Sequence, residues 1–298
     1  HVASSLMTQG LCDEIVLLDT DEGKARRHAD DIADSVAYMP LPAKIYAGGY
    51  EALADADIVV LSACSTIFEQ DRLLELDATV KVIAEIAPQL TASGFSGIVV
   101  SISNPCDVIA QYFARITGLN VVGTGTALDS ARLRRRLAAM LGVSPHSVCA
   151  YELGEHGDSS FVPWSVANIS NIPANAYQKA MENTDGMLIP PLNYADVEDY
   201  MRKSGGNVIK RKGATFYAVS ISVCHIVKCI LSGIDTNMTV STMLNGEYGI
   251  SDVCLSLLTT VGHKGVVNKL NLPLTESEHA ALVHSSECLK EIIKKVQI

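Results

Sequence analysis

Short, uninterrupted runs of apolar residues alternate with stretches of helical spacing along the first part of the chain. Runs rich in Val, Ile and Leu are typical of strands that are buried on both faces of a sheet. The strands expected from these runs are 13–20, 43–49, 58–64, 97–104 and 121–126. The stretches between them predict helices, most clearly over 72–94 and 107–118. This alternation predicts parallel strands joined by crossover helices, an α/β doubly wound sheet.

The pattern changes from about residue 123 onward. A basic helix, "LDSARLRRRLAAMLG", leads into the polar segment "YELGEHGDSS". Further expected elements are a mixed helical region over 194–204, a long helix over 214–233, paired antiparallel strands over 237–249 and 254–262, and a terminal helix over 275–296. We therefore expect two domains, an α/β domain over residues 1–122 and an α+β domain over residues 123–298.

Charge and cysteine usage exclude several classes of partner. Lys and Arg number 23 against 33 Asp and Glu, a net charge of −10, which argues against nucleic acid or an anionic membrane as the main partner. The longest apolar stretch, 215–234, contains His225 and Lys228, so it predicts a buried helix of a soluble domain instead of a membrane span. Eight scattered cysteines without metal-ligand spacing predict reduced thiols in a cytoplasmic protein and no metal site.

Asp19 ends the expected strand over 13–20, and ligands of doubly wound sheets bind at the carboxyl ends of strands. A carboxylate in this place accepts both hydroxyls of an adenosine ribose, which favours NAD as cofactor. The alternative is that Asp19 caps the following helix. The G-x-G-x-x-G loop that accompanies such a carboxylate does not occur in the sequence, and we expect it to precede His1.

Asp129, Arg132 and His156 are the candidates for chemistry in the second half of the chain. Asp129 and Arg132 are three residues apart on a helix and share a face, although a surface ion pair is the alternative. Arg132 offers a planar fork that can hold a carboxylate. Asp129 can bind one nitrogen of His156 and stabilise its protonated form, so that His156 exchanges a proton near neutral pH.

Two further polar residues lie at positions where they can act on a carbonyl group. Asn104 ends a strand just before Pro105 and can donate a hydrogen bond. Arg72 begins a helix after a loop, where its charge can polarise the same carbonyl.

The segments "SNPCDV", "GTGTALDSAR" and "GEHGDSSF", in this order and spacing, resemble the NAD-dependent L-lactate and malate dehydrogenase superfamily. The similarity continues through "KGATFYAVS" and "VGHKGVV" to the C-terminal helix. Glu155 before the histidine resembles the lactate branch, because malate enzymes usually show a second glycine there. The segments "ADADIVVLS" and "SGFSGIVVSISNP" are most similar to L-2-hydroxyisocaproate dehydrogenases, which take bulkier side chains.

The resemblance implies a Rossmann-type NAD-binding domain and reversible hydride transfer between NADH and a 2-oxo acid, either pyruvate or a bulkier one. It also implies a homo-oligomer, a tetramer or a dimer. The implied roles are His156 as acid and base, Asp129 as its orienting residue, Arg132 as carboxylate clamp, Arg72 as the group that polarises the carbonyl, Asn104 beside the carbonyl and nicotinamide, Asp19 at the adenosine ribose and Thr215 in the substrate pocket.

Some features depart from the family pattern. "STIF" runs into "EQDRLLEL" with fewer residues than the family's substrate-selecting lid, which suggests either missing mobile residues or a truncated, inactive homologue. Arg134 matches an arginine that binds fructose 1,6-bisphosphate in bacterial relatives, but Cys149 stands where they have a histidine. We therefore expect weak or no activation by that sugar phosphate. The alternative functions are a malate dehydrogenase and a non-catalytic binding protein.

Overall fold

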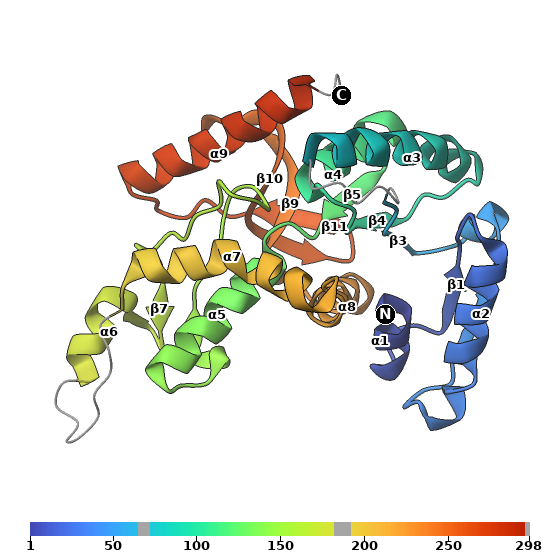
Figure 1. The fold of residues 1–298 in the computed structure, drawn as a ribbon, viewed down its shortest axis with the longest axis horizontal. Coiled ribbons are helices and arrows are strands. Elements are labelled where there is room, and N and C mark those ends of the chain that lie inside the picture. Colours follow the sequence, from blue (N-terminus) through green and yellow to red (C-terminus); the bar gives the residue numbers. More distant parts are fainter. Residues whose placement is uncertain (65–71, 182–191, 296–298) are drawn as a thin grey trace.

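A six-stranded sheet runs through the middle of the molecule, with strand order β11-β10-β9-β5-β4-β3 (Figure 1). This computed structural model describes residues 1–64, 72–181 and 192–295, without the side chains of residues 72–74, 178, 180 and 181. The strands are β1 (Glu14–Leu17), β2 (Lys44–Ala47), β3 (Ile58–Leu61), β4 (Ile98–Ser101), β5 (Asn120–Gly123), β6 (Val148–Cys149), β7 (Asn168–Ile169), β8 (Ile172–Pro173), β9 (Thr236–Asn245), β10 (Ser251–Gly262) and β11 (Gly265–Lys269).

Helices cover both faces of this sheet (Figure 1). The α-helices are α1 (Val2–Thr8), α2 (Glu22–Ala33), α3 (Arg72–Ala92), α4 (Cys106–Thr117), α5 (Ala127–Leu141), α6 (Ala174–Met181), α7 (Tyr194–Lys212), α8 (Tyr217–Ser232) and α9 (Glu276–Lys295). Short 3-10 helices are η1 (Val36–Tyr38), η2 (Tyr50–Leu53), η3 (Pro145–Ser147) and η4 (Glu247–Gly249).

Strand β4 shows why the sheet needs both helical layers. All four of its residues are buried, and successive side chains of a strand point to opposite faces. Val99 packs with Phe113 of α4 in the core cluster that also includes α3 and α9. Val100 packs with Ile226 of α8 and Leu6 of α1 in the cluster on the other face. The continuous apolar run in the sequence is therefore that of a strand buried on both sides.

The predicted α/β class is confirmed, with one difference in how the parallel strands associate. Strands β3, β4 and β5 pair in parallel, as expected. Strands β1 and β2 also pair in parallel, but they form a separate two-stranded sheet beside α2. Within the described residues, β1 does not pair with β3, and no other strand connects the two-stranded sheet to the six-stranded sheet.

The second half of the chain continues the same sheet. Strands β9 and β10 pair antiparallel, as predicted, and β9 joins β5 where Gly123 pairs with Ser241. The two halves therefore meet within one mixed sheet, at the carboxyl end of β5. The sequence pattern did not indicate this junction, because a single pairing between distant strands leaves no local signal.

Helices α7 and α8 differ from the expected elements. Helix α7 runs well past the predicted 194–204, to Lys212. The helix expected over 214–233 was predicted to be buried, but α8 buries one face only, and Tyr217 and Ile221 are 67% and 55% exposed. The reason is that its opposite side faces away from the sheet. Across the described helices, none combines the length and apolarity that a membrane crossing requires.

Candidate active site

Helix α5 begins at the junction of the two halves, directly after β5. Gly125 precedes it with a φ of +47°, and a Cβ there would lie 2.2 Å from Ser256 Oγ, so only glycine fits. The Thr126 N–H donates a hydrogen bond of 3.1 Å to Ser256 Oγ, and the Thr126 hydroxyl donates to the Glu152 carbonyl. The first turn of α5, with Asp129, is therefore fixed against β10 and the segment that carries His156.

The segment around His156 is held by backbone pairing on both sides. Leu153 pairs with Phe161, and Gly154 pairs with Ser256 of β10. The His156 N–H donates a hydrogen bond of 2.7 Å to Asp107 Oδ2 of α4. These contacts fix the backbone from which the imidazole projects.

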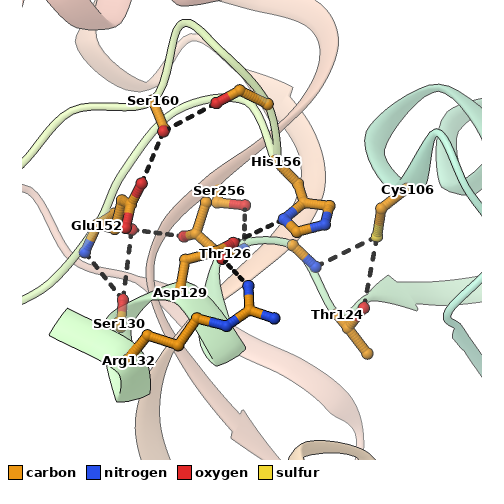
Figure 2. Close-up of polar contacts among 12 residues, drawn as sticks. Cys106, Thr124, Thr126, Asp129, Ser130, Arg132, Glu152, His156, Ser160 and Ser256 are labelled. Carbon is orange, nitrogen blue, oxygen red and sulfur yellow. Dashed lines mark hydrogen bonds and ion pairs between the residues drawn. The ribbon is translucent and has the colours of Figure 1, made fainter. Parts of the chain in front are cut away.

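Asp129 bridges His156 and Arg132 (Figure 2). Its Oδ2 lies 2.6 Å from His156 Nδ1, and its Oδ1 accepts a hydrogen bond of 2.7 Å from Arg132 Nη1. The exposed fractions of the side chains are 31% for His156, 15% for Arg132 and 11% for Asp129. The arrangement is thus a partly buried ion-pair network, and the alternative of a surface pair of Asp129 and Arg132 is excluded.

The network favours the charged forms of its members. Burial alone would lower the pKa of His156, but the charge and hydrogen bond of Asp129, together with the charge of Asp107, raise it to about 9. Burial opposes ionisation of Asp129, but His156 and Arg132 outweigh it and lower the pKa of that carboxyl below its ordinary value. His156 is therefore a protonated imidazolium at neutral pH, and its Nε2 is the nitrogen that Asp129 leaves available.

Two acidic residues that sequence reasoning missed lie next to this network. Asp107 is 2% exposed, and burial raises its pKa to about 6. Glu152 is 4% exposed, and burial together with the charge of Asp129 raises its pKa to about 7. The sequence did hold a signal for both residues, since each is a single acid within an apolar run, "CDVIAQYF" and "VCAYELG". Burying a carboxyl group without a partner is costly, so an acid in such a run is unusual.

Asn104 and Thr215, both predicted from the sequence, are not hydrogen-bonded members of the Asp129 network in the described structure. Asn104 is exposed at the end of β4 and forms a cis peptide bond with Pro105, and Thr215 is half-buried between α7 and α8. Neither makes a hydrogen bond to Asp129, Arg132 or His156 in the described structure. The side chain of Arg72, at the start of α3, lies outside the described residues.

Asp19 is exposed after the carboxyl end of β1, where the sequence predicted a ribose-binding carboxylate. Its Oδ1 accepts a hydrogen bond of 3.0 Å from the Asp21 N–H, and its Oδ2 lies 4.0 Å from Lys24 Nζ. The cap of α2 is Asp21, whose side chain accepts from the Lys24 N–H. Asp21, and not Asp19, therefore caps the helix, and Asp19 remains accessible to a ligand.

Comparison with known proteins identifies the class to which this fold and site belong. The family model described as lactate/malate dehydrogenase, NAD binding domain, matches residues 1–122. The model of the α/β C-terminal domain of the same family matches residues 126–297. The chain therefore belongs to the lactate/malate dehydrogenase family.

The individual relatives place the chain in the lactate branch of that family. It is 34% identical to L-lactate dehydrogenase 3 of Bacillus cereus over 298 residues, which cover 99% of this chain and 93% of the relative. It is 36% identical to L-lactate dehydrogenase 1 of Bifidobacterium longum over 293 residues, covering 97% and 92%. The crystal structure of the ligand-bound minor L-lactate dehydrogenase of Enterococcus mundtii superposes with a TM-score of 0.92 at 34% identity, covering 99% and 94%.

Proposed function

We propose that the protein is an NAD-dependent L-2-hydroxyacid dehydrogenase of the L-lactate dehydrogenase type. The observation that carries this function is the bridge of Asp129 between Arg132 and His156. It sets a fixed guanidinium, suited to a carboxylate, beside an imidazolium that can donate a proton. A 2-oxo acid has the two groups that these side chains can bind, a carboxylate and a carbonyl oxygen, on adjacent carbon atoms.

His156 is the proposed acid and base. Because Nδ1 is engaged by Asp129, the transferable proton is on Nε2. In the direction of reduction, His156 gives this proton to the carbonyl oxygen, and in the direction of oxidation it takes the proton back from the hydroxyl group. The balanced reaction is 2-oxo acid + NADH + H⁺ to L-2-hydroxy acid + NAD⁺.

Substrate orientation is assigned to Arg132, which would bind the carboxylate with the N–H groups that Asp129 does not use. The proposed roles of Asn104 as hydrogen-bond donor to the carbonyl, of Arg72 as the cation that polarises it, and of Thr215 as pocket residue rest on the family resemblance. In support, Asn104 lies at the carboxyl end of β4, the edge at which ligands of such sheets bind.

NAD is the cofactor, and when bound it supplies or accepts the hydride. An accessible carboxylate at the carboxyl end of a parallel strand fits an adenosine ribose, so Asp19 is the proposed ribose ligand. We assign residues 1–122 to the NAD-binding domain and residues 123–298 to the substrate-binding and catalytic domain. The ranges matched by the two family models support this division.

A glycine beside Arg132 favours a substrate with a side chain larger than that of pyruvate. Gly205 and Gly206 lie inside α7, where each glycine is about 1 kcal/mol less favourable than alanine. A Cβ on Gly205 would lie 3.7 Å from Arg132 Nη1, an ordinary contact, so the fold itself does not require glycine there. The missing side chain of Gly205 leaves room beside the guanidinium, which suits a bulky 2-oxo acid.

The proposed assembly is a homo-oligomer, a tetramer or a dimer, located in the cytoplasm. Apolar side chains on and just after α8, Tyr217, Ile221 and Ile234, are more than half exposed and suit contact with a second copy of the chain.

The test follows NADH oxidation with pyruvate, 2-oxoisocaproate, phenylpyruvate and oxaloacetate in turn. We expect turnover with pyruvate or a larger monocarboxylic acid. Fastest turnover of oxaloacetate would favour the malate dehydrogenase alternative and overturn the inference drawn from Glu155. No turnover with any of the four would favour the non-catalytic homologue.

A further inference from the structure

Glu152 lies beside Asp129, and both its backbone N–H and its carbonyl are hydrogen-bonded (Figure 2). Its N–H donates a hydrogen bond of 2.9 Å to Ser130 Oγ, and its carbonyl accepts from the Thr126 hydroxyl. Ser130 is in turn within 2.8 Å of Thr239 Oγ1 on β9. The backbone of Glu152 is therefore tied to the same turn of α5 that presents Asp129.

Only one of the two carboxyl oxygens of Glu152 has a hydrogen-bond partner in the described structure. Its Oε1 accepts a hydrogen bond of 2.7 Å from the Ser160 hydroxyl, which also lies 3.0 Å from the Gly157 carbonyl. Its Oε2 is buried and has no hydrogen-bond partner in the described structure. No ion pair joins it to Arg132 or His156, which both bind Asp129. An ionised Glu152 would thus be a buried charge without a partner, which is strongly unfavourable.

We propose that Glu152 remains uncharged while the substrate binds, and that its ionisation weakens binding of the anionic 2-oxo acid. This inference rests on the proposed function. Above about pH 6 the charges of Arg132 and His156 balance those of Asp129 and Asp107. Ionisation of Glu152 adds a negative charge that nothing in this network offsets, and it repels the substrate carboxylate.

The surroundings of Glu152 place this ionisation within the physiological range. Burial is the main cause that raises its pKa to about 7, and the charge of Asp129 adds to it. The Ser160 hydrogen bond, His156 and Arg132 act in the opposite direction. Strands β9 and β10 contribute the uncharged hydroxyls of Thr239 and Ser256 to the same region.

The first test is the pH dependence of the KM for the 2-oxo acid in the wild type and in Glu152→Gln. For a coupling of about one pKa unit, we expect the KM of the wild type to rise about fivefold between about pH 6 and about pH 8, toward a limit of about tenfold at higher pH. Glutamine has the shape of the neutral acid and cannot ionise, so in this variant the KM should stay flat over that range. Glu198→Gln, a matched change at a glutamate that binds Trp164 and Arg202, should keep the rise.

A second variant tests the claim without altering Glu152. Ser160→Ala removes the hydrogen bond that stabilises the ionised carboxylate, so the midpoint of the KM rise should move to higher pH. A midpoint that stays in place, or a rise that persists in Glu152→Gln, would assign the titration to another group and overturn the proposal.

Infrared difference spectra between the wild type and Glu152→Gln provide a measurement that needs no substrate. At about pH 6 the wild type should show the carbonyl band of a protonated carboxyl group that the variant lacks, and this band should vanish with a midpoint near pH 7. Absence of the band contradicts the proposed role of Glu152. Presence of the band without turnover of any 2-oxo acid contradicts the proposed function instead.

Discussion

Replacing Asp129 by Asn should convert His156 from a protonated to a largely neutral imidazole at working pH. The ordinary pKa of 6.5 is raised to about 9 in the structure, chiefly by Asp129 at 2.6 Å. At pH 7.5, a group with a pKa of about 9 is about 97% protonated, whereas one with a pKa of about 6.5 is about 9% protonated. Loss of the charge alone therefore predicts at least a tenfold lower kcat/KM for reduction of the 2-oxo acid.

The assay is the initial rate of NADH oxidation across pH, measured for the wild type, Asp129→Asn and a control, Asp199→Asn. Asp199 is exposed and pairs with Lys203 on α7, so the control makes the same chemical change away from the bridge. At saturating 2-oxo acid, where the KM change ascribed to Glu152 does not enter, the wild-type rate should fall as the pH rises through about 9, and in Asp129→Asn this fall should move toward 6.5. A fall that stays near pH 9 in Asp129→Asn would refute the role of Asp129 as the group that sets the charge of His156.

The same pair makes a contribution to stability whose sign can be worked out. The folded-state pKa of His156 is above its unfolded value, so its protonation stabilises the folded protein fully below about pH 6.5, as long as Asp129 is ionised. This contribution is lost as the pH rises through about 9. The difference in free energy of unfolding between the wild type and Asp129→Asn should therefore shrink at alkaline pH.

Three further predictions concern binding. Arg132→Lys should raise the KM for the 2-oxo acid at least tenfold with a smaller change in kcat, because lysine lacks the planar fork, and steady-state kinetics with equal KM would argue against a carboxylate clamp. Fructose 1,6-bisphosphate should activate the enzyme weakly or not at all, since Cys149 offers an uncharged thiol, hydrogen-bonded to Tyr151, where a cation would be needed; clear activation would show another anion site. Gly205→Ala should raise the melting temperature, because alanine favours the helix. It should lower kcat/KM more for phenylpyruvate than for pyruvate, because the added methyl group lies beside Arg132. An unchanged preference between the two acids would contradict a place for Gly205 in the pocket.

Local pattern was sufficient to predict most of the fold and the central part of the site. Buried strands can be predicted because they are continuous apolar runs. The spacing of Asp129 and Arg132, three residues apart on α5, predicted that their side chains share a face. His156 was a candidate from its own polar segment, and the family resemblance implied its role as acid and base. In all three cases the information lies in neighbouring residues or in a contiguous motif.

Features that depend on contacts between distant segments could not be predicted. The burial of Asp107 results from the approach of the His156 segment to α4, and that of Glu152 from its fixation between Ser130 and Thr126. The pairing of Gly123 with Ser241, which joins the two halves of the sheet, is of the same kind. Such contacts are set by tertiary packing, and no local propensity encodes them.

The most direct test of the account compares turnover and cofactor binding in His156→Ala with those in the wild type. We predict that kcat for reduction of the 2-oxo acid falls at least a hundredfold, the usual scale for loss of a general acid, while the Kd for NADH measured by fluorescence changes little. Turnover close to that of the wild type would contradict the assignment of His156 as the proton donor.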